Sequence, residues 1–327
     1  MSDRVESAGN LPLVAILATG GTIANTPSGR LHAGEVADAI PALKKVARLE
    51  VEEIVRVASS AIGHEHWLPL ARRTNELLSQ PQVKGVVVTH GSNTVEETAY
   101  FLGLTVKSDK PVVLTAAQRQ FTTVSSDSPK NFLQAVRVAA SDEARGKGAL
   151  VVTNDVINAA RDVSKDISTR LETYSSRDLG ALGFVDDDRV TFYRIPVKQH
   201  TLATPFDVLR IEELPRVDIV YTYAGADGAL VDAAVAHGAR GIVIAGFPTG
   251  VATPVMDESI RRTVAKGIPV VMTNRGGKGR VMDKKPEEAR PLVWGDNLTP
   301  VKARVLLMLA LTAARHRAAL QRMFEAY

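Results

Sequence analysis

The sequence contains no cysteine in its 327 residues. That absence excludes a disulfide framework, a thiolate zinc site, an iron–sulfur cluster and a cysteine nucleophile. A chain of this length can bury a large hydrophobic core, so it needs no disulfide or metal to hold it together. A thiol is therefore excluded as the nucleophile of covalent catalysis, and a hydroxyl side chain is a candidate.

Aromatic residues are scarce, and charges of the two signs are nearly balanced. Aromatic residues make up 5% of the chain, and 40 Lys and Arg face 36 Asp and Glu, for a net charge of +4. Nucleic-acid-binding surfaces usually need aromatic rings for base stacking and a clear excess of positive charge. Nucleic acid is therefore not expected as a partner.

Long hydrophobic runs are also absent. The most apolar stretch, residues 305–314, is only ten residues long, whereas a membrane-spanning helix needs about 20. This stretch predicts a buried helix, and we expect no membrane partner. Residues 1–7 contain acids and no apolar run, unlike a secretory signal, so we expect a cytoplasmic protein.

Short apolar runs alternate with helical patterns in the first half of the chain. Val95, Ala99 and Leu102 recur at the spacing of one helix face, and residues 132–139 repeat that pattern. Runs that are continuously apolar are typical of strands buried on both faces of a parallel sheet. Four such runs are residues 13–18, 86–88, 111–114 and 149–152. The alternation predicts an α/β fold.

The pattern changes near residue 183. Residues 183–185 and 190–193 flank the sequence Asp186-Asp187-Asp188-Arg189, which predicts a β-hairpin. The acidic triplet lacks the longer calcium-loop pattern and is interpreted as a turn. Residues 196–214 have few periodic features and are interpreted as a linker.

After the linker the alternation resumes, and it predicts a second domain. We therefore expect a larger N-terminal α/β domain with a mainly parallel sheet (1–195) and a smaller C-terminal α/β domain (215–327). Pro300 at a first helical position marks the start of a closing helix. The other predicted elements are strands at 218–221, 241–245 and 269–272 and helices at 228–237 and 257–266.

Two strand exits carry residues suited to chemistry. Gly20, Gly21 and Thr22 follow the first strand, and paired glycines let backbone N–H groups approach an oxygen closely. Thr22 is a candidate nucleophile if a base lies nearby; a tight strand exit without function explains the same pattern equally well. The segment lacks the Gly-Lys-Ser/Thr ending of a P-loop.

The second exit, residues 89–97, reads Thr-His-Gly-Ser-Asn-Thr-Val-Glu-Glu. Thr94 and Glu97 fit a helix capping box, while the short polar side chains also suit a small polar ligand at a helix N-terminus. His90 is interpreted as a hydrogen-bonded structural residue.

Four further segments have competing interpretations. Lys165 beside Ser164 is a candidate base, because burial lowers a lysine pKa, but a surface ion pair within residues 161–165 is favoured on the sequence alone. His64-Glu65-His66 is interpreted as a solvated loop more readily than as metal ligands. Residues 276–280 predict a surface loop, and residues 315–317 with Arg322 predict a solvated helix face.

Taken together, these segments resemble the bacterial L-asparaginase/glutaminase family, which uses a threonine nucleophile. The resemblance rests on Thr19–Ala24, Val88–Leu102, residues 161–165, His200-Thr201, residues 204–207 and residues 298–304. It implies two α/β domains and hydrolysis of a side-chain amide to a carboxylate and ammonia. It also implies no metal or organic cofactor, and a homotetramer that acts on a small amide.

The resemblance also implies roles for individual residues. Thr22 corresponds to the nucleophile that forms an acyl-enzyme, and Ser92 and Lys165 correspond to the pair that transfers a proton. Ser59 corresponds to a serine that holds the substrate carboxylate, and backbone groups near Ser92 and the Ala117 carbonyl are candidate partners of the amide. The implied substrate-binding residues are Gly21, Ser59, Ser60, Gly91, Asn93 and Ala117.

This chain departs from the family pattern at three places. Asn93 stands where the family has an aspartate that pairs with the substrate α-ammonium, and loss of one partner of a buried charge pair costs about 3–5 kcal/mol. No tyrosine lies in residues 25–33, where the family has a catalytic one, and Leu31 or a neighbour takes its place. Val251 and Lys284 align loosely with an asparagine and an acid that the C-terminal domain normally contributes.

Three functions remain open on these residues. The first is an ordinary asparaginase. The second is an amidase of the same family with a preference for amides that lack a free α-amino group. The third is a degenerate member that binds a small ligand without catalysis.

Overall fold

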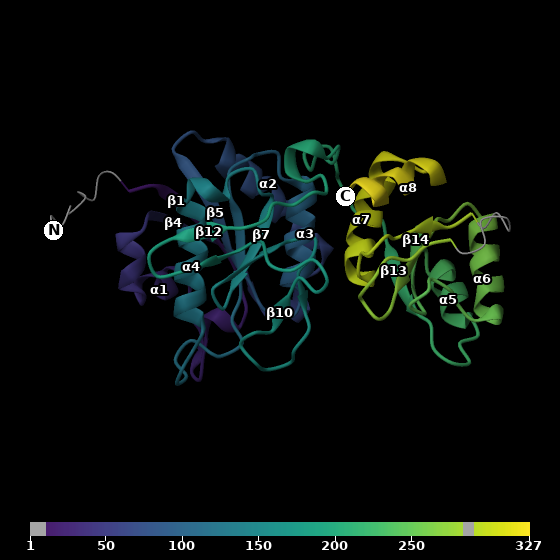
Figure 1. Cartoon of the computed structure of the whole chain (residues 1–327), viewed down its shortest axis with the longest axis horizontal. Helices are drawn as coiled ribbons and strands as arrows, with labels where there is room; N and C mark the ends of the chain where they lie inside the picture. Colours follow the sequence, from purple (N-terminus) through teal and green to yellow (C-terminus); the bar gives the residue numbers. More distant parts are fainter. Residues whose placement is uncertain (1–10, 284–290) are drawn as a thin grey trace. The chain divides into compact units, whose positions relative to one another are not determined.

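The structure is a computed structural model that describes residues 11–283 and 291–327. The chain divides into two compact units, with the boundary between Leu202 and Ala203. The predicted linker, residues 196–214, spans this boundary and contains one short 3-10 turn, η6 (Thr201–Ala203). Each unit is a layered α/β body, drawn in purple to teal and in green to yellow in Figure 1.

The first unit is built on an eight-stranded sheet in the order β12-β11-β8-β7-β6-β5-β1-β4. Strands β4, β1, β5, β6 and β7 run parallel, and β8, β11 and β12 continue the sheet in antiparallel pairs. The bounds are β1 Leu13–Gly20, β4 Arg48–Val57, β5 Val83–Thr89, β6 Val112–Thr115, β7 Ala149–Thr153, β8 Val156–Ala159, β11 Gly183–Val185 and β12 Val190–Phe192. The predicted parallel core and the predicted hairpin are both confirmed.

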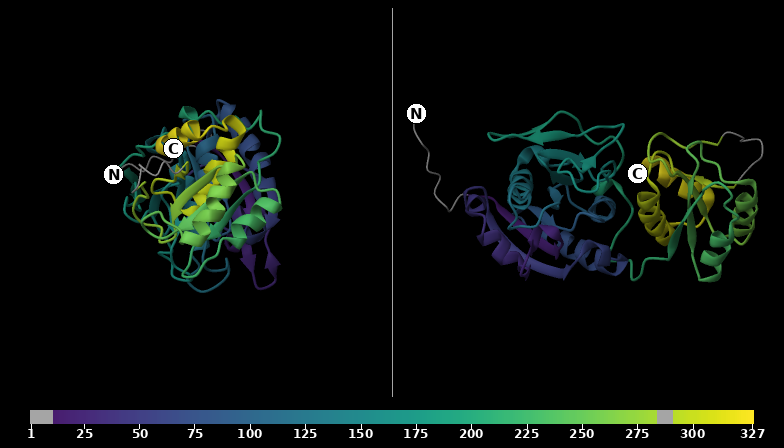
Figure 2. Two further views of the ribbon diagram at one scale, coloured as in Figure 1. Left: turned by 90° about the vertical axis from the view of Figure 1, so that its right-hand side faces the viewer. Right: turned by 90° about the horizontal axis from the view of Figure 1, so that it is seen from below.

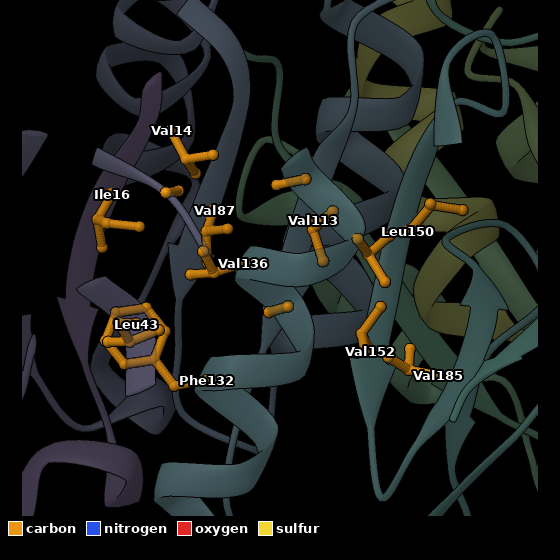
Figure 3. Packing of buried hydrophobic residues seen from close by; sticks show 14 of the residues in the cluster. Val14, Ile16, Leu43, Val87, Val113, Phe132, Val136, Leu150, Val152 and Val185 are labelled. Carbon is orange, nitrogen blue, oxygen red and sulfur yellow. The ribbon is translucent and has the colours of Figure 1, made fainter. Parts of the chain in front are cut away.

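Helices cover both faces of this sheet. On one face α2 (His64–Ser79) and α3 (Val95–Thr105) pack together, and α4 (Ser128–Ala140) packs on β5, β6 and β7 from the other. Figure 3 shows the core under α4, where Phe132 and Val136 meet Val87 and Val113 of the sheet. The alternating strand positions are buried from both sides, which explains the continuous apolar runs. Shorter elements are η2 (Thr22–Ala24), α1 (Ala33–Asp38), η3 (Pro41–Lys45), η4 (Ser59–Ala61) and η5 (Asp142–Ala144).

Two small ribbons complete this unit. The pair β2 (Asn25–Thr26) and β3 (Gly29–Arg30) forms a hairpin after the first strand exit. The pair β9 (Ser164–Lys165) and β10 (Tyr174–Ser175) is antiparallel, and Lys165 lies opposite Tyr174. This second ribbon brings Lys165 into the site described below.

The second unit is a four-stranded parallel sheet in the order β13-β14-β15-β16. Helices α5 and α6 cover one face and α7 and α8 the other, as the green and yellow helices of Figure 2 show. The bounds are β13 Val217–Tyr221, α5 Ala229–Ala236, β14 Gly241–Gly246, α6 Pro254–Ala265, β15 Val270–Asn274, β16 Val293–Trp294, α7 Pro300–Ala313 and α8 Arg317–Ala326. The described part of the chain holds no helix that is long and apolar enough to cross a membrane.

Several local predictions were wrong. His64-Glu65-His66 forms the first turn of α2 instead of a loop. Helix α6 begins at Pro254, three residues before the predicted start, because the Thr253 hydroxyl caps it by accepting the Met256 N–H. Residues 315–317 lie at the junction of α7 and α8 and not along one helix face; the Arg317 guanidinium donates to the Leu292 carbonyl.

Candidate active site

The candidate site lies where the strand order of the large sheet reverses. After β1 the chain adds β4 on one side, then returns through α2 to place β5 on the other side of β1. In open α/β sheets, ligands bind at such a switch point, outside the carboxyl ends of the strands. Both strand exits singled out in the sequence therefore meet at this edge.

Glycine contacts fix how closely these exits approach. A Cβ atom added to Gly21 would lie 2.3 Å from the Cα of Gly91, and Gly21 has φ +87°, which side chains rarely tolerate. A Cβ added to Gly91 would lie 2.6 Å from the Ser59 Oγ. The loops after β1 and β5 therefore touch backbone to backbone at Gly21 and Gly91, and the Ser59 side chain of the loop after β4 packs against Gly91.

Thr22 opens the short helix η2 directly after Gly21 and is partly exposed. Its carbonyl accepts the Asn25 N–H, which closes the turn. Among residues 11–283 and 291–327, no hydrogen bond restrains the Thr22 hydroxyl. A hydroxyl that is exposed and unrestrained at a strand exit can attack a bound electrophile.

Ser92 and Lys165 form the central polar pair. The Lys165 Nζ donates to the Ser92 Oγ at 2.8 Å and to the Asn93 Oδ1 at 3.0 Å. Burial lowers the Lys165 pKa from its ordinary value. Among the described residues, the favoured surface ion pair is therefore not seen at Lys165. Arg161 pairs with Asp162 at 3.1 Å, but both of these side chains are largely buried. A lysine with a lowered pKa beside a hydroxyl can move a proton.

Ser59 is buried and is held by the loop after β5. Its Oγ accepts the Asn93 N–H at 3.1 Å, and its carbonyl accepts the Thr94 hydroxyl at 2.8 Å. The predicted capping box of Thr94 and Glu97 is therefore wrong, since the Thr94 side chain leaves its helix to bond Ser59. The Ser59 hydroxyl proton stays available to a ligand oxygen.

The remaining predicted binding residues lie on two neighbouring loops. Ser60 is exposed next to Ser59 on η4, and Ala117 is buried just after β6. The loop after Ala117 is fixed by Asp127, whose carboxylate accepts the N–H groups of Gln118 and Arg119 at 2.9 and 2.8 Å.

His90 is fully buried and hydrogen-bonded. Its Nδ1 contacts the Gly91 carbonyl at 2.9 Å, and its Nε2 contacts the Thr98 hydroxyl at 3.1 Å. Burial lowers the pKa of His90 to about 4, so the imidazole is neutral at neutral pH. These contacts agree with the predicted structural role.

Comparison with known proteins decides the family. Residues 13–198 match the family described as "Asparaginase, N-terminal", and residues 216–324 match "Glutaminase/Asparaginase C-terminal domain". The chain belongs to the asparaginase family.

Curated members of the asparaginase family match almost the whole chain. The L-asparaginase 2 of Bacillus subtilis (strain 168) is 43% identical, with 97% of this chain and 87% of the relative covered. The L-asparaginase 2 of Escherichia coli (strain K12) is 38% identical, with 97% and 94% covered. The probable cytoplasmic L-asparaginase of Campylobacter jejuni superposes with a TM-score of 0.93 at 40% identity, covering 97% of this chain and all of that one. The predicted family and fold are thereby confirmed.

The structure shows what occupies residues 25–33, where the resemblance implies a catalytic tyrosine that this chain lacks. Residues 25–30 form the tight β2–β3 hairpin, with Pro27 and Ser28 at its turn. The Leu31 N–H donates to the Ala24 carbonyl at 2.9 Å, and its side chain packs on the hydrophobic core. Leu31 therefore supplies packing and no polar group at that place.

The third departure, at Val251 and Lys284, falls in the second unit. Val251 forms an isolated β-bridge with Phe247 in the turn after β14. Lys284 lies outside the described residues. Asp186, in the predicted acidic turn, donates its N–H to the Arg189 carbonyl at 2.9 Å, which agrees with a hairpin turn. In the described ranges, no three His, Asp or Glu side chains gather as metal ligands would.

Two residues of the site escaped the sequence analysis. The Tyr174 hydroxyl donates to the Ser92 carbonyl at 2.6 Å. The Glu96 carboxylate accepts the Lys165 backbone N–H at 3.2 Å. Tyr174 and Lys165 face each other on the β9–β10 ribbon, which has only two residues in each strand. So short a ribbon leaves no periodic pattern in the sequence that would predict it.

Proposed function

We propose that this chain is an amidohydrolase that hydrolyses the side-chain amide of asparagine, or of a closely related small amide, to a carboxylate and ammonia. The observation that carries the proposal is the 2.8 Å contact between the Lys165 Nζ and the Ser92 Oγ at the switch point of the sheet. Relatives named L-asparaginase across nearly the full chain support the same activity.

The proposed reaction proceeds through an ester of Thr22. The Thr22 Oγ1 attacks the amide carbon and its proton passes to a base; the C–N bond then breaks and the proton leaves with the nitrogen as ammonia. Water attacks the ester carbon, the C–O bond to Thr22 breaks, and the hydroxyl proton is restored. The sum is amide plus water to carboxylic acid plus ammonia, and at neutral pH the acid proton passes to the ammonia to give carboxylate and ammonium.

Ser92 and Lys165 act as the base in this proposal. When the Lys165 amine is neutral, the 2.8 Å contact reverses, and the lysine accepts the Ser92 proton as Ser92 accepts one from Thr22 or from water. Burial, which lowers the Lys165 pKa, increases the neutral fraction near neutral pH. No metal or organic cofactor is required in this scheme.

Substrate recognition is assigned to the surrounding loops. The Ser59 hydroxyl and Ser60 hold the substrate carboxylate, and the backbone at Gly21, Gly91 and Ala117 holds the reacting amide. Gly21 and Gly91 touch, so no side chain separates their loops. The Gly21 N–H itself donates to the Val57 carbonyl at 3.1 Å, so other backbone N–H groups of these loops are assigned to the oxyanion.

The nucleophile assignment has a direct test. Thr22→Ala should abolish ammonia release from the best substrate of an amide panel, while the circular dichroism spectrum stays unchanged. Full activity in this variant would show that Thr22 is not the nucleophile. If Ser92 and Lys165 variants also released ammonia as fast as the wild type, the third candidate, a non-catalytic binder, would be favoured, with the activity due to a contaminant. The Lys165–Ser92 pair opposes that candidate, since binding alone needs no hydroxyl–lysine pair.

A second candidate function is the amidase with a preference for amides that lack a free α-ammonium. The observation that favours it is Asn93, whose uncharged side chain already accepts from Lys165 at 3.0 Å. Asn93 is exposed in the free chain. Until substrate covers this position, the absence of a carboxylate there therefore costs about 0–1 kcal/mol of ion-pair energy, the range of surface pairs, and less than the loss of a buried pair.

Assays on asparagine, glutamine, succinamate and N-acylated asparagine separate these two candidates. Efficient turnover of free asparagine with slow turnover of the others supports the first and eliminates the second. Asn93→Asp should improve the use of free asparagine relative to succinamate. An unchanged ratio would remove Asn93 from the specificity argument.

Assembly and location are part of the proposal as well. We expect a homotetramer built as a dimer of dimers, to be checked by light scattering at micromolar protein. A cytoplasmic location is expected, and the description of the Campylobacter jejuni structure as probable and cytoplasmic supports it. Cell fractionation with a periplasmic marker tests this location.

A further inference from the structure

The β9–β10 ribbon contacts Ser92 twice. Lys165 on β9 donates to the Ser92 Oγ, and Tyr174, which lies opposite Lys165 on β10, donates to the Ser92 carbonyl at 2.6 Å. One rigid pair of facing residues therefore reaches both ends of Ser92. Among the described residues, Ser92 makes no further hydrogen bond to this ribbon.

The ribbon is itself fixed to helix α3. The Glu96 carboxylate, in the first turn of α3, accepts the Lys165 backbone N–H at 3.2 Å. Ser92 lies just before the same helix. Ribbon, loop and helix thus form a closed ring of hydrogen bonds in which Tyr174 supplies the bond to the loop backbone.

The Tyr174 hydroxyl is suited to a permanent donor role. The side chain is buried, and burial, with the nearby Glu96 charge, raises its pKa far above the usual range. It therefore keeps its proton at every working pH. Its hydrogen is also committed to a carbonyl, so Tyr174 does not replace the missing loop tyrosine in proton transfer.

We propose that Tyr174 is a positioning residue, which holds the Ser92 backbone so that the Ser92 hydroxyl meets Lys165 at hydrogen-bond distance. The proposal rests on the function proposed above. Without the phenol, the buried Ser92 carbonyl loses its partner and the loop moves relative to Lys165. Proton transfer depends steeply on such geometry. Ser59 lies on a different loop, and the substitution leaves its hydrogen bonds with Asn93 and Thr94 in place, so substrate binding should change less than proton transfer.

The test is Tyr174→Phe, which keeps the ring and removes only the hydroxyl. Because a misplacement of about 1 Å can cost about 10²-fold, a smaller shift should lower kcat about tenfold with KM changed less than about twofold. The matched control is Thr173→Val, on the neighbouring residue. The buried Thr173 hydroxyl donates to the Ile167 carbonyl and makes no hydrogen bond to Ser92.

Both variants lose one buried hydroxyl–carbonyl bond, so both should melt at lower temperature, and activity is measured below both melting transitions. Loss of kcat in Tyr174→Phe with wild-type kcat in Thr173→Val supports the positioning role. Wild-type kcat in Tyr174→Phe, or an equal loss of kcat in both variants, overturns it. Thr22→Ala, assayed in parallel, reports separately on the proposed function: if Thr22→Ala is inactive while Tyr174→Phe is unaffected, only the role of Tyr174 fails.

Discussion

Replacing Asn93 with aspartate would place a carboxylate where an amide oxygen now lies 3.0 Å from the Lys165 Nζ. The charged partner stabilises the protonated lysine, so the Lys165 pKa should rise. At 3.0 Å, two unit charges attract by about 1.4 kcal/mol even in the dielectric of bulk water, which corresponds to about one pKa unit. A dielectric half as large doubles this, so we expect a rise of about one to two units.

The other charges around Lys165 remain in place in this variant. Glu96 binds the Lys165 backbone N–H, and the Asp166 carboxylate is paired with Arg177 at 2.8 Å. Tyr174 stays neutral. The change in pKa can therefore be attributed to residue 93.

The assay is kcat/KM for succinamate against pH from about 6 to 10, by ammonia release. Succinamate has no α-amino group, so its own charge is constant across this range. If neutral Lys165 is the base, activity rises as pH increases through its pKa, and the rising limb should move to higher pH in Asn93→Asp. Asn93→Ala removes an acceptor without adding charge, so its limb should not move upward.

Gln82→Glu serves as the charge-matched control. Gln82 is exposed at the amino end of β5, the opposite end of the strand from Ser92. In Gln82→Glu, the rising limb of the pH profile should stay within about 0.2 pH unit of the wild type. The distance from residue 82 to Lys165 exceeds a Debye length of about 8 Å, so the added charge is screened. A limb that is unmoved in Asn93→Asp, or moved equally in Gln82→Glu, would refute the assignment of Lys165 as the base.

Three other predictions concern recognition, backbone and stability. Ser59→Ala should raise KM for carboxylate-bearing amides about tenfold, the scale of one hydrogen bond to a charged group, with kcat nearly unchanged in steady-state assays. Gly21→Ala should destabilise the protein by more than about 1–3 kcal/mol in urea titrations, because a Cβ would lie 2.3 Å from the Gly91 Cα at φ +87°. His90 has a pKa of about 4 in the folded chain and 6.5 ordinarily; the unfolded state therefore binds its proton first, and stability should fall by about 3 kcal/mol as pH drops from 6.5 to 4. His90→Gln should remove that part of the pH dependence.

The fold was predictable wherever burial leaves a pattern in the sequence. Strand β1 is buried along its whole length, and its unbroken apolar run reports that directly. Strand β4 escaped prediction because it is the edge strand, and its half-exposed face carries the charges of residues 48–57. An edge strand of this kind resembles an exposed segment more than a parallel core strand.

The site was predictable in its strand exits and not in its cross-contacts. Thr22 and Ser92 follow apolar strands and contain hydroxyls, so local sequence singles them out. The Lys165–Ser92 contact joins residues 73 positions apart, and the Tyr174 contact joins residues 82 apart. Lys165 was a candidate base on the sequence, but only the family resemblance favoured that role over a surface ion pair. Tyr174 had no signal, because a buried phenol is equally consistent with core packing. The capping box failed for a similar reason: the Ser59 carbonyl, distant in sequence, competes for the Thr94 hydroxyl.

Asn93 links substrate preference to the chemistry of the base. A carboxylate at this position would attract an α-ammonium, but it would also hold the proton on Lys165 and reduce the neutral base at neutral pH. The Asn93 amide does not attract an α-ammonium, but it also does not hold the proton on Lys165. Its oxygen still accepts a hydrogen bond from Lys165 without adding charge. For an amide without an α-amino group, the carboxylate offers no gain in binding and only the penalty to the base. Asparagine at position 93 is therefore the better choice for such a substrate, and this favours the second candidate function wherever turnover is needed near neutral pH.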